Sequence, residues 1–120
     1  MADLKRDLIK YCRDKAKSKY VKASECYICG STTDLEFHHY NSMTAMLNKW
    51  LKGKLVETAE DIMSIRDEFI SIHHEQIYDK TVTLCKTHHA KLHKIYGVKP
   101  SLATAGKQSR WVERQHEMAI

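Results

Sequence analysis

The sequence contains no long apolar run. No segment comes near the roughly 18 consecutive apolar residues that a membrane-spanning helix requires. The first ten residues mix charged and apolar side chains, so they lack the apolar segment of a secretory signal peptide. We therefore expect neither a membrane helix nor a signal peptide, and we expect the protein to act in the cytoplasm.

Proline is nearly absent, with one residue at position 100, and no linker or low-complexity tract divides the chain. A chain of 120 residues suffices for one domain and is too short for two conventional ones. We expect a single domain over 1–120. Its expected parts are a basic helix over 1–22, a first metal-binding turn and strand over 24–40, a helical insertion over 42–78, a second strand, turn and helix over 80–97, and a basic extension over 98–120.

Hydrophobic spacing predicts an N-terminal helix and two helices in the insertion. Over 2–21 an apolar residue recurs every fourth position, which makes Cys12 a core residue rather than a ligand. Asn41 or Ser42 can cap a helix that Gly53 ends. Thr58 opens a further helix that ends near His74. The expected apolar faces are Leu4, Leu8, Cys12, Ala16 and Tyr20, then Met43, Met46, Leu47, Trp50 and Leu51, then Ile62, Ile65, Phe69 and Ile72.

Two short segments have strand character, over 35–40 and 81–84, and a helix is expected over 88–96, before Gly97. The chain is mildly basic, with 20 Lys and Arg against 15 Asp and Glu, which suits a polyanionic partner without proving one. If that partner is a nucleic acid, the candidate contacts to its phosphates are Lys15, Lys17, Lys19, Lys22, Lys107, Arg110 and Arg114. Each group has an equal alternative as a merely solubilising surface, and Trp111 either stacks on DNA or docks the extension.

Cysteine is scarce but clustered with histidine. Four cysteines would allow two disulfides in a secreted protein, yet Cys26 and Cys29 form a Cys-x2-Cys turn followed by Gly30. Cys85 and His88 provide a second half-site of the same spacing, and four such ligands suit a tetrahedral structural zinc. The alternative is a buried apolar Cys85 and a lone redox pair, which lacks a thioredoxin-like sequence context.

Four further histidines flank these half-sites. His89 and His93 are four residues apart, so on a helix both rings project from one face and can bind one ion. His38 and His39 are adjacent in a strand and must point to opposite sides, so only one of them can share that ion. This division suits phosphodiester hydrolysis, which needs a cation on the phosphate and a base for water.

These segments resemble the HNH endonucleases of the ββα-metal (His-Me finger) superfamily, in the branch that contains zinc knuckles. The resemblance rests on residues 26–30, 35–39 and 83–89 together with His93. It implies an α+β fold in which a two-stranded antiparallel hairpin and a helix are stapled by structural zinc. It also implies His38, His89 and His93 as ligands of the catalytic ion and His39 as general base, with 5′-phosphate and 3′-hydroxyl products.

The sequence departs from the family pattern at Lys80, where members usually carry an asparagine that orients the catalytic loop. Asp79, Asn41, His73 and His74 are candidates to replace it. An imidazole site favours Mn²⁺, Ni²⁺, Co²⁺ or Zn²⁺ over Mg²⁺ as the catalytic ion. The expected substrate is duplex DNA, and both a monomer and a homodimer remain open. A non-catalytic zinc-binding adaptor for nucleic acid or protein is the rival interpretation.

Overall fold

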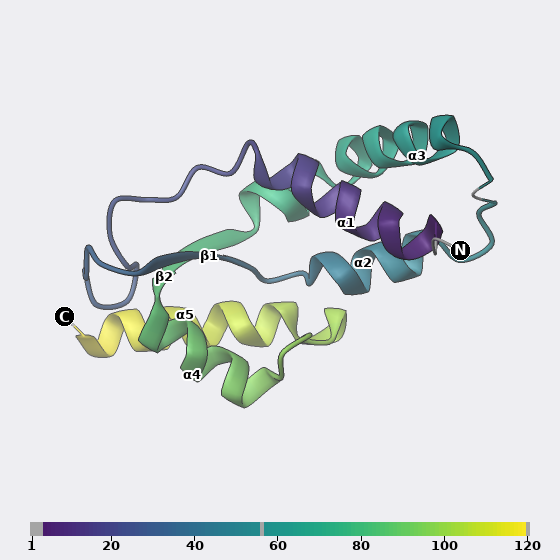
Figure 1. The fold of residues 1–120 in the computed structure, drawn as a ribbon. Helices are drawn as coiled ribbons and strands as arrows, with labels where there is room; N and C mark the ends of the chain where they lie inside the picture. Colours follow the sequence, from purple (N-terminus) through teal and green to yellow (C-terminus); the bar gives the residue numbers. More distant parts are fainter. Residues whose placement is uncertain (1–3, 56, 120) are drawn as a thin grey trace.

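The computed structural model describes residues 4–55 and 57–119, with residues 4–7 described by their backbone only. The expected helix start at residues 2 and 3 and the side chains of Leu4 and Lys5 therefore lie outside the described part. The elements in chain order are α1 (Leu4–Lys17), β1 (Leu35–His39), α2 (Met43–Trp50), α3 (Ala59–Ile72), the π-helix η1 (Glu75–Asp79), β2 (Thr81–Cys85), α4 (Lys86–Tyr96), the 3-10 helix η2 (Leu102–Thr104) and α5 (Ala105–Ala119) (Figure 1).

Strands β1 and β2 form an antiparallel pair that joins the two halves of the elongated molecule, which measures 52 × 26 × 26 Å. Leu35 pairs with Cys85 and His39 with Thr81, so the start of β1 lies beside the end of β2. Helices α1, α2 and α3 gather at one end, whereas α4 and α5 lie on the other side of the hairpin (Figure 1). This confirms the predicted α+β class. In the described part of the chain, no helix is both long and apolar enough to span a bilayer.

The first hydrophobic core joins α1, α2, α3 and η1. Leu8, Cys12 and Ala16 are fully buried, as the four-residue spacing predicted, and Leu47 and Phe69 pack against them. Two caps define the insertion: Ser42 accepts a hydrogen bond from the Ala45 amide, and Thr58 and Asp61 form a reciprocal capping box.

Two details of this half differ from the prediction. The N-terminal helix ends at Lys17 rather than near position 21. Ile72 is 57 % exposed, so its assignment to the apolar face was wrong. After α3 the chain widens into the π-helix η1, and the fully buried Ile77 of η1 occupies the core instead. A π-helix is not visible in hydrophobic periodicity, because its hydrogen bonds shift by one residue from those of an α-helix.

A second core lies between the hairpin, α4 and α5. Leu84, Leu92 and Val112 are fully buried in it, and Ile28 of the Cys-x2-Cys turn packs against them. Helix α4 begins at Lys86, two residues before the predicted start, because the Cys85 side chain caps it by accepting the His88 amide. Gly97 ends it with a φ of 94°, a conformation that glycine adopts without strain.

The C-terminal segment, predicted as a basic extension without an assigned helix, forms α5 over Ala105–Ala119. Helix α5 buries Gln108 and Val112 against the second core, with Trp111 partly buried beside them. These three positions fall on one face of a helix, and they outweigh the polar composition that suggested a tail. Trp111 therefore docks this segment, which was one of its two predicted roles. Lys107, Arg110 and Arg114 lie on the exposed side of α5.

Candidate active site

The Cys-x2-Cys turn is shaped by backbone hydrogen bonds. The Gly30 amide donates to the Cys26 carbonyl at 2.9 Å, and the Cys26 amide donates to the Ser31 carbonyl at 2.8 Å. Gly30 has a φ of 74°, which an L-residue rarely adopts. The turn therefore directs the Cys26 and Cys29 thiols toward the end of β2, where Cys85 and His88 lie.

These four side chains, Cys26, Cys29, Cys85 and His88, bring one ligand atom each within 4.8 Å of the others. Cys85 Sγ lies 3.2 Å from His88 Nδ1 and 3.9 Å from Cys29 Sγ, and Cys26 Sγ lies 4.0 Å from His88 Nδ1. Ligands bound to one tetrahedral zinc are roughly 3.4–3.8 Å apart, so only small rotations separate this cluster from a zinc site.

The surroundings of Cys26 suit a cation, whereas the neighbouring thiols Cys26 and Cys85 help to raise the pKa of Cys29. Burial raises the pKa of the Cys26 thiol, but hydrogen bonds with the backbone of Cys29, Cys85 and Ile28 outweigh burial, and the net pKa is lowered. A lowered pKa favours the thiolate, which is the metal-binding form. All four cysteines are free. Cys12 lies in the other core, where burial raises its pKa to about 11, as expected of a structural thiol.

A second cluster holds three imidazoles. His38 Nδ1 lies 3.0 Å from His89 Nε2, and His93 Nε2 lies 2.9 Å from the same His89 nitrogen. His38 is 3 % exposed. Helix α4 presents His89 and His93 one turn apart, and β1 presents His38 from the opposite wall. Two nitrogens bound to one ion at about 2.1 Å are roughly 3.0–3.4 Å apart, so these separations fit a shared cation.

The outer nitrogen of each ring faces an oxygen. His38 Nε2 lies 2.8 Å from Gln108 Oε1, and His89 Nδ1 lies 3.0 Å from Glu36 Oε1. His93 Nδ1 lies 2.8 Å from the Gly97 carbonyl oxygen. Carboxylate, carbonyl and amide oxygens accept hydrogen bonds, so all three outer nitrogens carry the proton.

The orientation of the Gln108 amide follows from its other contact. Gln108 Nε2 donates to Thr104 Oγ1 at 3.0 Å, and Thr104 Oγ1 in turn donates to the Ser101 carbonyl at 2.7 Å. The amide nitrogen is thus committed to Thr104. The amide oxygen must face His38, which fixes the proton of His38 on Nε2.

A neutral imidazole has one N–H, and each of these rings uses it outward. The inner nitrogens of His38, His89 and His93 therefore point unprotonated lone pairs at one another, and their 2.9 and 3.0 Å separations are not hydrogen bonds. Burial lowers the pKa of His38 to about 3 and also lowers that of His89, so a proton does not fill the space at neutral pH. The three rings fit a divalent cation, with the partners of their outer nitrogens holding the tautomers.

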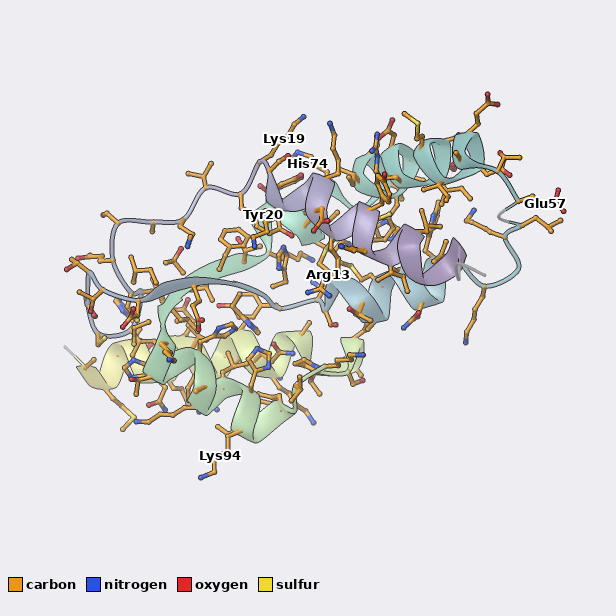
Figure 2. The ribbon with its side chains drawn as sticks, in the orientation of Figure 1. Arg13, Lys19, Tyr20, Glu57, His74 and Lys94 are labelled. Atoms are coloured by element: carbon orange, nitrogen blue, oxygen red, sulfur yellow. The ribbon has the colours of Figure 1, made fainter. Side chains whose placement is uncertain are left out.

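His39 lies on the opposite face of β1, among aromatic rings. Its ring centroid is 4.9 Å from that of Tyr20 and 5.2 Å from that of Phe37. Figure 2 shows Tyr20 in the segment that leads from α1 toward the hairpin. His39 Nε2 is buried without a partner in the described part of the protein. Burial lowers the pKa of His39 to about 4, and a hydrogen bond with the Ile77 backbone opposes this shift.

The backbone of Ile77, rather than the side chain at position 80, contacts His39. Lys80 is exposed, and its ammonium lies 3.7 Å from Glu75 rather than near a histidine. His73 is hydrogen-bonded to the Phe69 carbonyl, and the His74 ring lies at a tilt against Tyr78. Among the described contacts, the partner of His39 is thus the backbone of η1, not any of the four residues proposed from the sequence.

Sequence reasoning missed the partners of the outer nitrogens. Glu36 had a signal, because residues two apart in a strand share a face and Glu36 precedes His38 by two. The Gly97 carbonyl also had one, since helix C-terminal carbonyls are open acceptors. Gln108 had none, because the segment that carries it was not recognised as a helix.

The basic residues proposed as DNA contacts lie on two surfaces. Lys15, Lys17 and Lys19 are exposed at the end of α1, and Lys22 is exposed but donates to the Leu35 carbonyl at 3.2 Å. Lys15 and Lys19 share a shallow groove with Asp67, which offsets part of their charge. The second surface is the exposed side of α5.

The fold and the two clusters define a small α+β protein with one Cys/His cluster that could hold zinc and one three-histidine cluster that could hold a second cation. A family model for the phage T5 nicking endonucleases, described as the nicking endonuclease family, matches residues 1–120. The chain belongs to this family, and it is therefore a nuclease that cleaves DNA. No solved structure matches it.

Proposed function

We propose that the protein is an HNH-type enzyme that nicks duplex DNA by metal-dependent hydrolysis, with its whole length acting as one nuclease domain. The observation that supports this most directly is the inward orientation of three unprotonated imidazole nitrogens, together with a fourth histidine on the opposite face of β1 whose Nε2 has no partner among the described residues. Membership of the nicking endonuclease family supports DNA as the substrate. It also favours a nuclease over a non-catalytic zinc-binding adaptor. One active centre in one copy suffices to cut one strand.

His38, His89 and His93 would hold the catalytic ion, and Cys26, Cys29, Cys85 and His88 would hold structural zinc. A divalent ion at the histidines supplies positive charge to the scissile phosphate and its leaving 3′ oxygen. The protein's own contribution has two parts. Burial keeps His38 and His89 neutral, because it lowers the pKa of both rings. Gln108 and Glu36 hold these two rings in the metal-binding tautomer by accepting their outer N–H groups.

His39 is the proposed general base. Its hydrogen bond with the Ile77 backbone leaves Nε2 to accept a proton from the attacking water. Burial keeps the DNA-free ring deprotonated at neutral pH, because it lowers the pKa to about 4. An approaching phosphodiester anion raises that pKa again by favouring the protonated ring, which brings the base closer to the range in which it works best.

The base and the three-histidine cluster lie on opposite faces of β1, so one phosphate must reach both. In the described sheet β2 pairs with one edge of β1, and the other edge has no strand partner. A DNA strand crossing that edge near the end of β1 meets His38 from one face and His39 from the other. Hydrolysis there leaves 5′-phosphate and 3′-hydroxyl ends, with the exposed lysines and arginines of α1 and α5 contacting flanking phosphates.

Replacement of His39 tests the proposal. Plasmid nicking by His39→Ala should fall by about 10²- to 10⁴-fold, the usual contribution of a general base. DNA affinity, zinc content and thermal unfolding should stay close to the wild type. His74→Ala is the matched control, because His74 is an exposed histidine that contacts Tyr78 outside both clusters.

The metal requirement gives a second readout. Protein that retains its structural zinc should nick faster with Mn²⁺ or Ni²⁺ than with Mg²⁺, because imidazole ligands suit borderline ions. Full activity of His39→Ala, or activity with Mg²⁺ alone, would contradict the proposed site.

A further inference from the structure

A groove of about 580 Å³ lies outside both metal clusters, between α2, the end of α3, η1 and η2. Three lysines line it, Lys49, Lys52 and Lys54, and no carboxylate does. All three are exposed, and none forms an ion pair within the described residues. The groove therefore presents net positive charge without internal compensation.

Aromatic packing shapes the floor of this groove. Trp50 lies in edge contact with His73, and the Lys54 ammonium sits 4.0 Å from the centre of the Trp50 ring. The cation–π contact holds Lys54 against the wall, with its charge at the surface of the groove. Because Lys54 already covers the ring, the groove is better suited to phosphates than to a stacked base.

The walls of the groove are also connected through the chain to the surroundings of the proposed catalytic histidines. Asn41, which lines it, follows His39 by two residues. Gln76 lines it too and directly precedes Ile77, whose backbone bonds His39. Leu102 lines it from η2, two residues before Thr104, which orients the Gln108 partner of His38. Three separate segments thus connect the walls of the groove to the surroundings of His38 and His39.

We propose that this groove is the principal binding surface for the DNA backbone, where Lys49, Lys52 and Lys54 contact phosphates beside the scissile bond. This inference rests on the proposed function and extends it from the chemistry to the path of the substrate. The contacts are to phosphates, so they are independent of base sequence and sensitive to salt. The other lysine-lined groove is the weaker candidate, because it contains Asp67.

The test compares salt dependence of binding in two matched triple variants. One replaces Lys49, Lys52 and Lys54 with glutamine, and the other replaces Lys15, Lys17 and Lys19, so both lose three charges. Binding to a labelled duplex is followed by fluorescence anisotropy between 50 and 200 mM salt, without added catalytic metal. Three phosphate contacts contribute a slope of about 2.7 in log K against log salt, so the wild type should lose about 40-fold more affinity than the groove variant. The α1 variant should keep most of the wild-type slope.

Lysine acetylation of the wild type provides an independent measurement that requires no variant. DNA should protect Lys49, Lys52 and Lys54 several-fold, whereas Lys94, which projects outward from α4 (Figure 2), should react equally with and without DNA. A groove variant with wild-type affinity and slope, or groove lysines that DNA does not protect, would overturn the proposed DNA-binding role of the groove. Nicking by the wild type would still support the proposed nuclease function in that case. A wild type that neither binds nor nicks DNA would overturn both.

Discussion

Gln108 is the residue whose replacement most directly tests how the three-histidine cluster is held. Gln108→Leu keeps a buried side chain of similar size but removes the oxygen that accepts the His38 Nε2 proton at 2.8 Å. The ring can then move its proton to Nδ1, where His89 Nε2 lies 3.0 Å away. In that tautomer His38 donates to His89, and its metal-binding lone pair is lost.

The structure sets the size of this effect. His38 Nε2 is enclosed, so without Gln108 its N–H has no acceptor, and a buried unsatisfied donor costs about 1–3 kcal/mol. Metal binding requires that tautomer, so the cost appears as weaker affinity for the catalytic ion, by roughly 10- to 100-fold. The structural cluster shares no hydrogen bond with Gln108, and its zinc affinity should not change.

Cobalt titration separates the two sites, because only the cysteine cluster gives thiolate charge-transfer absorption. Gln108→Leu should retain that band and nick more slowly at limiting metal, with the rate partly recovered at high metal concentration. Gln108→Glu should restore affinity, because its carboxylate also accepts the His38 proton. Wild-type metal affinity and nicking in Gln108→Leu would show that the tautomer is not held in this way.

Two further predictions concern zinc and pH. Cys29→Ser should release zinc and, if the site contributes about 3 kcal/mol, lower Tm by roughly 10–20 °C. The control Cys12→Ala lies in the other core, so it should lose stability but keep its zinc. Equal zinc content in the two variants would refute the ligand assignment. The pKa of His39 is about 4 in the folded state and about 6.5 in the unfolded chain. Between pH 4 and pH 6.5 the folded state therefore binds fewer protons than the unfolded state. Its contribution to stability is full above pH 6.5 and declines as the pH falls toward 4, by roughly 2 kcal/mol between pH 6.5 and 5. Urea unfolding of the wild type should show this fall in the free energy of unfolding on acidification, and His39→Phe should show a smaller fall. A free energy of unfolding that rises on acidification would contradict the assignment.

The local parts of the site could be predicted because their geometry is set within a few residues. The Cys-x2-Cys spacing forms a turn, the His-x3-His spacing puts two rings on one helical face, and adjacent strand residues alternate. These rules placed Cys26 with Cys29, His89 with His93, and His38 opposite His39. Pairing of β1 with β2 then joined the halves, although more than forty positions separate the strands in sequence.

Long-range partners could not be predicted in this way. Gln108 lies 70 positions from His38, and only the packing of α5 against the hairpin brings them together. The composition of that segment is polar and basic, so a helix anchored by Trp111 and Val112 was misinterpreted as a tail. The Ile77 backbone contact depends on η1, whose hydrogen-bond register differs from that of an α-helix.

The two clusters are mechanically linked through the first turn of α4. His88 belongs to the Cys/His cluster and His89 to the three-histidine cluster, so one peptide bond joins them. Cys85 ends β2 and caps α4, which fixes the angle between the hairpin that carries His38 and the helix that carries His89 and His93. Zinc on the Cys/His cluster would clamp that angle, because Cys85 and His88 lie at this junction and Cys26 and Cys29 lie in the adjoining turn. Loss of zinc should therefore separate the imidazoles of His38, His89 and His93, even though no ligand of the Cys/His cluster belongs to the three-histidine cluster.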